Sequence, residues 1–156
     1  SQQLADVAAA VAKPGFEPVP QYTRPEDGPP GSFRMITGRA PMHTFSHTVG
    51  NPRLAELMPE NTVWMNADDA ARLKLISGTR VRLRNQDGVV SDPVALTATE
   101  RLRPGCVYLV HGFGSQSKAW KSAYRKGAST ALLTTRVKVD PLMGGTSIHS
   151  NFVTLE

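Results

Sequence analysis

A short segment near the front of the chain combines glycine, a cation, hydroxyls and rings in a way that suits a polar ligand. It contains Thr37, Gly38, Arg39, His43, Thr44, Phe45 and Ser46. Glycine lets a backbone amide come close to a ligand, and arginine forms charge-assisted hydrogen bonds with phosphate or ring carbonyl groups. The alternative is a loop whose Arg39 is solvated and whose Phe45 packs in the core.

Two other places offer polar groups of the same kind. His111, Gly112 and Phe113 end one apolar run, and Asn151 begins the last one. An asparagine amide both donates and accepts hydrogen bonds, so it suits a ring that carries both kinds of group. A structural histidine and a turn-capping asparagine are the alternatives at these positions.

The order of Ser129, Asp140 and His149 matches the catalytic order of an α/β-hydrolase, and residues 110–114 resemble the oxyanion-hole segment of that class. The spacing argues against a hydrolase. A nucleophile elbow needs a strand, a sharp turn and a helix, and further strands separate the acid from the histidine. The 21 residues from Ser129 to His149 are too few to hold them.

His43 and His47 stand four residues apart, a spacing that places two zinc ligands on one face of a helix. The sequence nearby offers no third zinc ligand. The residues between and after them, among them Thr44, Phe45 and Thr48, are poor helix formers. A metal site is therefore not expected here.

Composition narrows the class of protein. A chain of 156 residues has the length of one compact domain, and no apolar run is long enough to span a bilayer. Cys106 is the only cysteine, which excludes an internal disulfide framework and a cysteine cluster for metal. The net charge of +5 suits a nucleic acid, a membrane surface or a phosphate-bearing cofactor. A basic β-barrel that binds nucleic acid is the main alternative, although aromatic residues make up only 6% of the chain.

The first part of the chain differs from the rest. Residues 1–34 hold six prolines and show little periodicity, so we expect a linker or tail from a preceding domain. The chain starts with Ser1 instead of Met, which we interpret as part of a longer protein or a processed product. Residues 35–156 are expected to form the folded domain.

Short apolar and alternating runs separated by turn residues predict a mainly β fold with short helices, closed into a barrel. Strands are expected at 33–36, 63–66, 81–84, 89–97, 106–111 and 151–155, with a further one inside 129–139. Residues 86–88 would form the turn of a hairpin. A helix is expected at 68–73, where acidic residues favour its start.

An ordered series of short motifs runs through the domain. It consists of Ile36-Thr37-Gly38-Arg39, His43-Thr44-Phe45-Ser46, Asn51-Pro52, Pro59-Glu60-Asn61, Asp69-Ala70 and Arg103-Pro104-Gly105. This series resembles the last domain of the dimethyl sulfoxide reductase family. The continuation, with motifs at 111–114, 126–129 and 151–153, is most similar to the thiosulfate, polysulfide and tetrathionate reductase branch.

The resemblance implies a six-stranded double-psi β-barrel that covers one side of a bis(molybdopterin guanine dinucleotide) cofactor with molybdenum, or tungsten in some members. Residues 37–46 would be the main cofactor-contacting segment, with His43 and Phe45 facing the pterin or the metal pocket. His111 would approach the pterin or the substrate funnel, and Asn151 would contact a pterin. The family often has an asparagine within 129–134, where Ser129 or Thr130 stands as a substitute in this chain.

The same resemblance implies a function that this chain cannot perform alone. It would be the carboxy-terminal cofactor-binding domain of a molybdenum oxidoreductase that reduces a sulfur oxyanion or polysulfide. The metal ligand and any iron-sulfur cluster would lie upstream. The implied partners are the other domains of the catalytic subunit and an iron-sulfur electron-transfer subunit, with no nucleic acid and no membrane insertion. The implied location is the bacterial periplasm.

Overall fold

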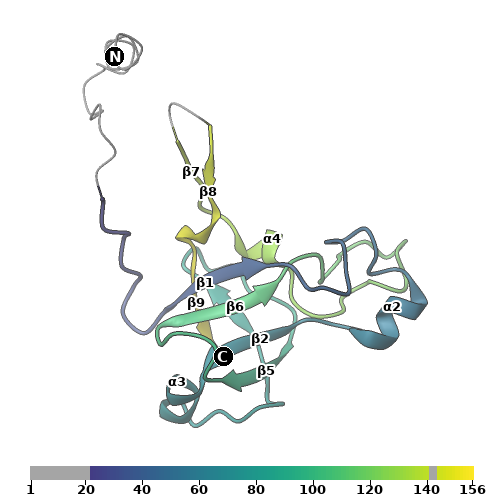
Figure 1. Cartoon of the computed structure of the whole chain (residues 1–156), viewed down its shortest axis with the longest axis horizontal. Coiled ribbons are helices and arrows are strands. Elements are labelled where there is room, and N and C mark those ends of the chain that lie inside the picture. Colours follow the sequence, from purple (N-terminus) through teal and green to yellow (C-terminus); the bar gives the residue numbers. More distant parts are fainter. Residues whose placement is uncertain (1–21, 141–143) are drawn as a thin grey trace.

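A computed structural model describes residues 22–140 and 144–156. Most of its regular structure is one curled sheet with strand order β3-β5-β2-β6-β1-β9-β4 (Figure 1). The strands are β1 (Phe33–Gly38), β2 (Thr62–Asn66), β3 (Arg80–Val81), β4 (Leu83–Asn85), β5 (Val94–Thr99), β6 (Cys106–Val110) and β9 (Phe152–Leu155). The outermost strands β3 and β4 are joined through Arg82 alone, so the sheet is nearly closed. This confirms the predicted mainly β, barrel-like fold.

Alternate residues along the strands fill the barrel, because successive side chains of a strand point to opposite faces. The buried positions include Met35, Val63, Met65, Leu83, Val94, Leu96, Val107, Leu109 and Val153. At one end of the barrel the inward-facing side chains become polar. Thr37 follows Met35 in this alternation and is also buried.

The register of β1 brings two predicted site segments together. β1 runs parallel to β6, with Gly38 opposite Val110, so both strands end at the same edge. The backbone N–H of His111 donates to the carbonyl of Gly38 at 2.9 Å. The loops that leave the two strands therefore start side by side.

The helices are short. They are α2 (Pro52–Leu57), α3 (Ala67–Arg72), α4 (Thr130–Leu133) and the 3-10 turn η1 (Ile148–Ser150). Helix α3 confirms the helix expected at 68–73, with the side chain of Asn66 accepting from the amides of Asp68 and Asp69. Helix α2 was not predicted, although Asn51 as its cap and Pro52 in its first turn are typical start signals.

The hairpin expected around residues 86–88 is present only as a turn. The N–H of Asn85 donates to Val89 at 2.8 Å, and an isolated bridge joins Arg84 to Val90. The returning strand begins later than predicted, at Val94, and pairs with β3 and β2. Pro93 comes directly before it and has no N–H to contribute to a ladder.

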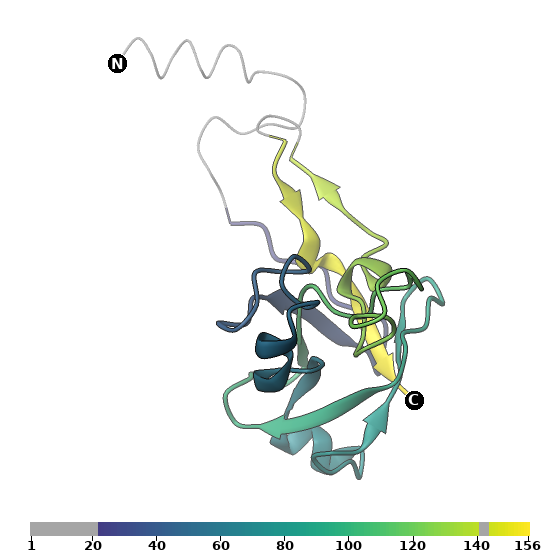
Figure 2. The ribbon, with the colours of Figure 1, turned by 90° about the vertical axis from the view of Figure 1, so that its right-hand side faces the viewer.

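The strand expected within 129–139 was predicted in part correctly. Ser129 caps α4 by accepting from the N–H of Leu132, because a serine hydroxyl can replace a missing backbone partner at a helix start. Strand β7 (Lys138–Val139) follows and pairs with β8 (Thr146–Ser147) in a separate two-stranded sheet. We call this hairpin the arm. Figures 1 and 2 show that it points away from the barrel.

Residues 22–32 cross the barrel wall as an extended strap. A Cβ built on Gly28 would lie 2.2 Å from the ring of Phe152, so the strap lies directly on that ring. The guanidinium of Arg34 covers the same ring at 4.6 Å from its centre. Most of the predicted linker, residues 1–21, lies outside the described residues. Across the described part of the chain, no helix has both the length and the apolar character needed to span a bilayer.

Candidate functional site

A cavity of about 510 Å³ lies where the loop after β1, the segment after β6 and the start of α4 meet. Its walls include Phe45, Ser46, His111, Gly112, Ser129 and Thr130. We call it the site cavity. Five of the predicted site residues line it: Phe45, Ser46, His111, Gly112 and Phe113. These segments lie far apart in the sequence, and the barrel brings them together.

Glycines without room for a side chain fix the walls. Gly112 has φ +100°, and a Cβ there would lie 2.4 Å from the backbone carbonyl carbon of Phe45. Gly114 has φ +72°, and a Cβ there would lie 2.4 Å from the amide nitrogen of Ser129. The segment after β6 is therefore in direct backbone contact with both other walls, which a residue with a side chain would prevent.

His111 is the titratable group of the site cavity. Its Nδ1 lies 2.7 Å from the hydroxyl of Thr130, and its ring lies 5.8 Å from that of Phe45. Burial lowers the pKa of His111, and the charge of nearby His149 lowers it further. The ring is thus neutral near pH 7 and can donate from one nitrogen and accept at the other.

Asn61 stabilises the segment that leads into α4, which forms one wall of the site cavity. This fully buried side chain donates to the carbonyls of Val110 and Ala128, at 2.8 and 2.9 Å, and accepts from the N–H of Ala128 at 2.9 Å. A Cβ on Gly127 would lie 2.1 Å from its Oδ1. Asn61 therefore ties the segment before α4 to the end of β6.

His43 is buried behind the site cavity, at 5% exposure. Its Nε2 lies 2.9 Å from the carbonyl of Met58, its Nδ1 lies 3.3 Å from the hydroxyl of Thr48, and its ring meets Phe113 edge to face. Both ring nitrogens have partners within the chain, and His43 does not line the site cavity. A position facing the pterin or metal pocket stays a prediction. The pair with exposed His47 is not helical, and the described residues contain no group of three or more potential metal ligands.

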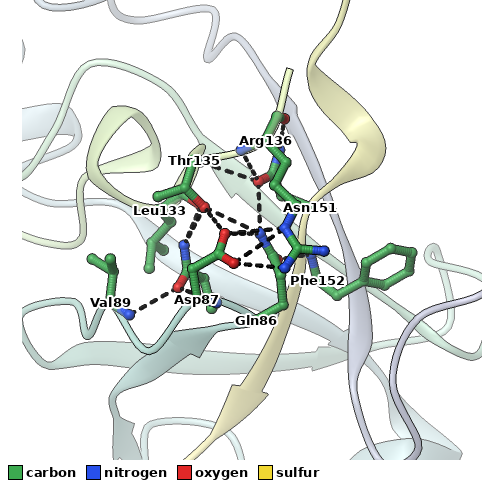
Figure 3. Close-up of polar contacts among 9 residues, drawn as sticks. Gln86, Asp87, Val89, Leu133, Thr135, Arg136, Asn151 and Phe152 are labelled. Carbon is green, nitrogen blue, oxygen red and sulfur yellow. Dashed lines mark hydrogen bonds and ion pairs between the residues drawn. The ribbon is translucent and has the colours of Figure 1, made fainter. Parts of the chain in front are cut away.

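Asn151 has a structural role in the chain. Its side chain is fully buried. The oxygen accepts from the amides of Thr135 and Arg136 and from Gln86, and the nitrogen donates to the carbonyl of Arg136 (Figure 3). The nitrogen also donates to the carbonyl of Ile148. These bonds hold the turn after α4, and contact between Asn151 and a pterin stays a prediction.

The hairpin turn completes the network around Asn151. The carboxylate of Asp87 accepts from Arg136 at 2.6 Å and from the hydroxyl of Thr135 at 2.5 Å (Figure 3). The hydrogen bond from Arg136 is the main cause that holds the pKa of Asp87 well below its usual range. The buried amide of Asn85 adds a bond to the carbonyl of Leu133 at 3.0 Å. The segment after α4 is thus anchored on the side away from the site cavity.

The remaining predicted residues lie around the end of β1. Gly38 packs against Tyr108, whose hydroxyl would lie 2.8 Å from a Cβ at that position. Arg39 is exposed and stacks on the ring of Phe45 at 4.4 Å, at the rim of the site cavity. Thr44 is exposed, and its N–H donates to Thr48. Contact between these residues and a ligand stays a prediction.

The structure adds two residues that sequence reasoning did not place in a ligand site. Trp120 lines the site cavity, and its indole nitrogen would lie 2.7 Å from a Cβ on Gly50. His149 contacts the buried Thr37, with its Nε2 3.3 Å from the hydroxyl. No local signal marks either residue, because both contacts join distant segments. Ser129 caps α4 and His149 lies against Thr37, so their catalytic pairing is not supported.

Comparisons with known proteins agree with the fold. Residues 33–152 match the family described as the Molydopterin dinucleotide binding domain. The chain is 30% identical over 121 residues to the thiosulfate reductase molybdopterin-containing subunit PhsA of Salmonella typhimurium, covering 78% of this chain and 15% of that protein. It is 29% identical over 164 residues to the dimethyl sulfoxide reductase DmsA of Escherichia coli, covering 100% of this chain and 20% of that protein.

A solved structure shares the same fold. The acetylene hydratase from Pelobacter acetylenicus superposes with a TM-score of 0.74 at 16% identity, over 96% of this chain and 22% of that chain. The chain spans a fifth or less of the length of the two reductases named above. The alternative of a nucleic-acid-binding barrel finds no support in these comparisons. The matched range runs from β1 to the first residue of β9 and includes every residue that lines the site cavity. Because the family model matches most of the chain, the chain belongs to the molydopterin dinucleotide binding domain family.

Proposed function

We propose that the site cavity and its rim hold part of a bis(molybdopterin guanine dinucleotide), with other domains of a molybdenum oxidoreductase supplying the rest of the socket. The convergence of Phe45–Ser46, His111–Gly112 and Ser129–Thr130 on one cavity carries this proposal. The family membership states the class of ligand, and the geometry gives the place on this chain.

The residues present fit such a ligand. A pterin ring needs donors and acceptors, which the hydroxyls of Ser46 and Ser129 and the ring of His111 provide. A pyrophosphate needs cations, and Arg39 lies at the rim, preoriented by its stacking on Phe45. The side chain of Trp120 adds an apolar surface on which a flat ring can pack.

In this proposal the chain binds and orients, and the cofactor supplies two-electron oxidation and reduction at its metal. Thr130 fixes the orientation of His111 through their hydrogen bond. The tight backbone contact at Gly112 keeps the walls at a fixed separation. Burial of the ring and phosphates against these walls excludes water from the cofactor on this side.

A binding experiment tests this function. The chain is mixed anaerobically with cofactor released from a purified molybdenum enzyme, passed through gel filtration, oxidised and assayed for pterin fluorescence. We expect the wild type to retain pterin. A double variant that carries both Ser129→Ala and Thr130→Val should retain at least tenfold less. Asn51→Ala, which changes a helix cap outside the cavity, is the matched control and should retain it normally. Equal retention by all three proteins, or none by the wild type, would contradict the proposal.

We further propose that the complete enzyme reduces a sulfur oxyanion or polysulfide. The relative named as a thiosulfate reductase supports this class of substrate, and the relative named as a dimethyl sulfoxide reductase supports reduction at sulfur more generally. Either molybdenum or tungsten fits the proposal, and metal analysis of the complete subunit separates them. Reduced viologen would serve as electron donor in assays with thiosulfate and tetrathionate, with dimethyl sulfoxide for comparison. If neither thiosulfate nor tetrathionate oxidised the viologen, this substrate class would be contradicted.

The proposal also covers the cellular location of the protein, its partners and the connectivity of the barrel. We propose a periplasmic enzyme in which this barrel packs on the other domains of its catalytic subunit and an iron-sulfur subunit delivers electrons, with any cluster of the catalytic subunit upstream. Cell fractionation and co-purification test these statements.

We propose a double-psi connectivity for the barrel, and the two parallel strand pairs β1–β6 and β2–β5 support it.

A further inference from the structure

Two histidines flank the end of β1. The Nε2 of His149 lies 3.3 Å from the hydroxyl of Thr37 and 3.4 Å from its N–H. On the other side, the N–H of His111 donates to Gly38, the residue that follows Thr37. A continuous run of contacts therefore joins the imidazole of His149 to the segment that carries His111 and on to Thr130.

The two rings line different cavities. His111 lines the site cavity, and His149 lines a second cavity of about 690 Å³ between the strap, the arm and β1. We call the latter the basic cavity, because Arg34, Arg103 and Lys138 also line it. Thr37 and Gly38, at the end of β1, connect the two histidines through the contacts given above.

The charges that face the histidines are mostly positive. Arg34 of β1 donates to the carbonyl of His149 at 2.8 Å, and Lys138 of the arm pairs with Glu26 of the strap. Arg103, from the turn before β6, makes no ion pair with any described residue. Glu26 is the only carboxylate among the described residues that line this cavity.

The charge near His111 is also positive. Arg39 lies over Phe45, whose ring contacts that of His111. Helix α4 presents Thr130 to the imidazole and no charged group within the described residues of that helix. A proton on His111 is therefore disfavoured by burial and by positive charge on His149, and an anion in the cavity would offset both effects. The lowered pKa of His111, caused by burial and then by His149, agrees with this arrangement.

We propose that His111 and His149 form a coupled pair that takes up one proton from solvent when an anionic ligand occupies the cavities they line. His149 is thereby a further residue of the ligand site, placed there by its contact with Thr37. This inference rests on the proposed function for the class of ligand, a phosphate-bearing dinucleotide. It adds that binding is tighter in acid, since the protonated pair offers a positive charge to the phosphates.

Coupling is tested first without a ligand, by NMR titration of the histidine ring protons in the full chain between pH 5 and 8.5. His149→Gln keeps a polar side chain near Thr37 but cannot be protonated, so the pKa of His111 should rise. His47→Gln removes an exposed histidine and is the matched control, with the titration of His111 unchanged. If His149→Gln does not fold, the wild-type spectra decide: a second inflection in the curve of His111 that coincides with the measured inflection of the His149 ring protons supports coupling. Identical curves in wild type and His149→Gln, or a single inflection, would overturn it.

Proton uptake is tested with GDP-mannose, whose pyrophosphate is a diester and keeps its charge between pH 6 and 8. We expect affinity about tenfold higher at pH 6 than at pH 8, equivalent to about 1.4 kcal/mol, with both histidine signals moving toward their protonated positions. The pH dependence should disappear in His149→Gln and remain in His47→Gln. Equal affinity at both pH values overturns the inference and leaves the proposed function standing. Absence of binding at both pH values by the wild type overturns both.

Discussion

The Nδ1 atom of His111 lies 2.7 Å from the hydroxyl of Thr130, and this contact joins the end of β6 to the start of α4 across the wall of the site cavity. Thr130 itself is 2% exposed, so its hydroxyl has little access to water. The hydrogen bond therefore fixes the orientation of the imidazole that faces the cavity.

Replacing Thr130 by Val removes the hydroxyl and keeps the shape of the side chain. The variant should lose about 1 to 2 kcal/mol in the free energy of unfolding, because the Nδ1 of half-buried His111 loses its partner. Thr130→Ser keeps the hydroxyl and should restore the orientation of the ring, at a smaller cost in stability. Urea denaturation and the NMR signals of His111 measure both effects. A Thr130→Val protein with unchanged His111 signals would show that the contact does not orient the ring.

Gly112→Ala should be more harmful than alanine at a glycine that has positive φ but open space around it. Backbone strain costs about 1 to 2 kcal/mol, and the clash with the carbonyl of Phe45 adds about 1 to 3 kcal/mol. Gly78→Ala is the matched control, since Gly78 has φ +91° with no atom within 4 Å of an added Cβ. Chemical denaturation should place Gly112→Ala below Gly78→Ala in stability. The reverse order would mean that the walls of the site cavity are not in fixed contact.

Asn151→Ala should destabilise the chain by about 3 to 5 kcal/mol, because several buried groups lose their partners at once. Asn51→Ala removes a single exposed cap of α2 and should cost about 1 kcal/mol. Urea unfolding of the two variants provides the comparison. If Asn151→Ala were as stable as Asn51→Ala and instead lost affinity for the cofactor, Asn151 would contact the ligand and not stabilise the fold.

Asp87 makes stability depend on pH in acid. The folded pKa of Asp87 lies below the usual value of about 3.9. Its contribution to the free energy of unfolding is therefore present above that value and is lost as pH falls toward the folded pKa. The urea midpoint of the wild type should therefore drop more between pH 7 and pH 3 than that of Asp87→Asn. Arg136→Gln removes the other half of the pair and should show the same reduced drop, and added salt should narrow the difference. Equal drops in wild type and both variants would contradict this role.

The barrel could be predicted because its signal is local. Inward positions such as Met35, Met65 and Leu109 follow the period of two that a half-buried strand requires. The strand expected at 89–97 began late for a reason that is also local, since Pro93 stands directly before β5. The ordered motifs pointed to several residues that line the site cavity, but periodicity alone did not.

The arrangement of the site depended on contacts that no short segment encodes. Thr37 and His149 are 112 residues apart and meet through the pairing of β1 with β9 and the position of η1. A ligand-contacting asparagine and a structural one have the same donors and acceptors, so the role of Asn151 became visible only from its burial. The same reasoning applies to His43, whose partners come from the loop and α2 behind it.

Hydrogen–deuterium exchange with and without released cofactor, carried out anaerobically on the full chain, tests the central claim most directly. The account predicts slower exchange at residues 45–46, 111–115 and 129–133, and no change around Gly78, which lies outside the site cavity. Exchange that slows elsewhere and stays unchanged at these three segments would contradict the assignment of the site cavity as the cofactor-binding surface.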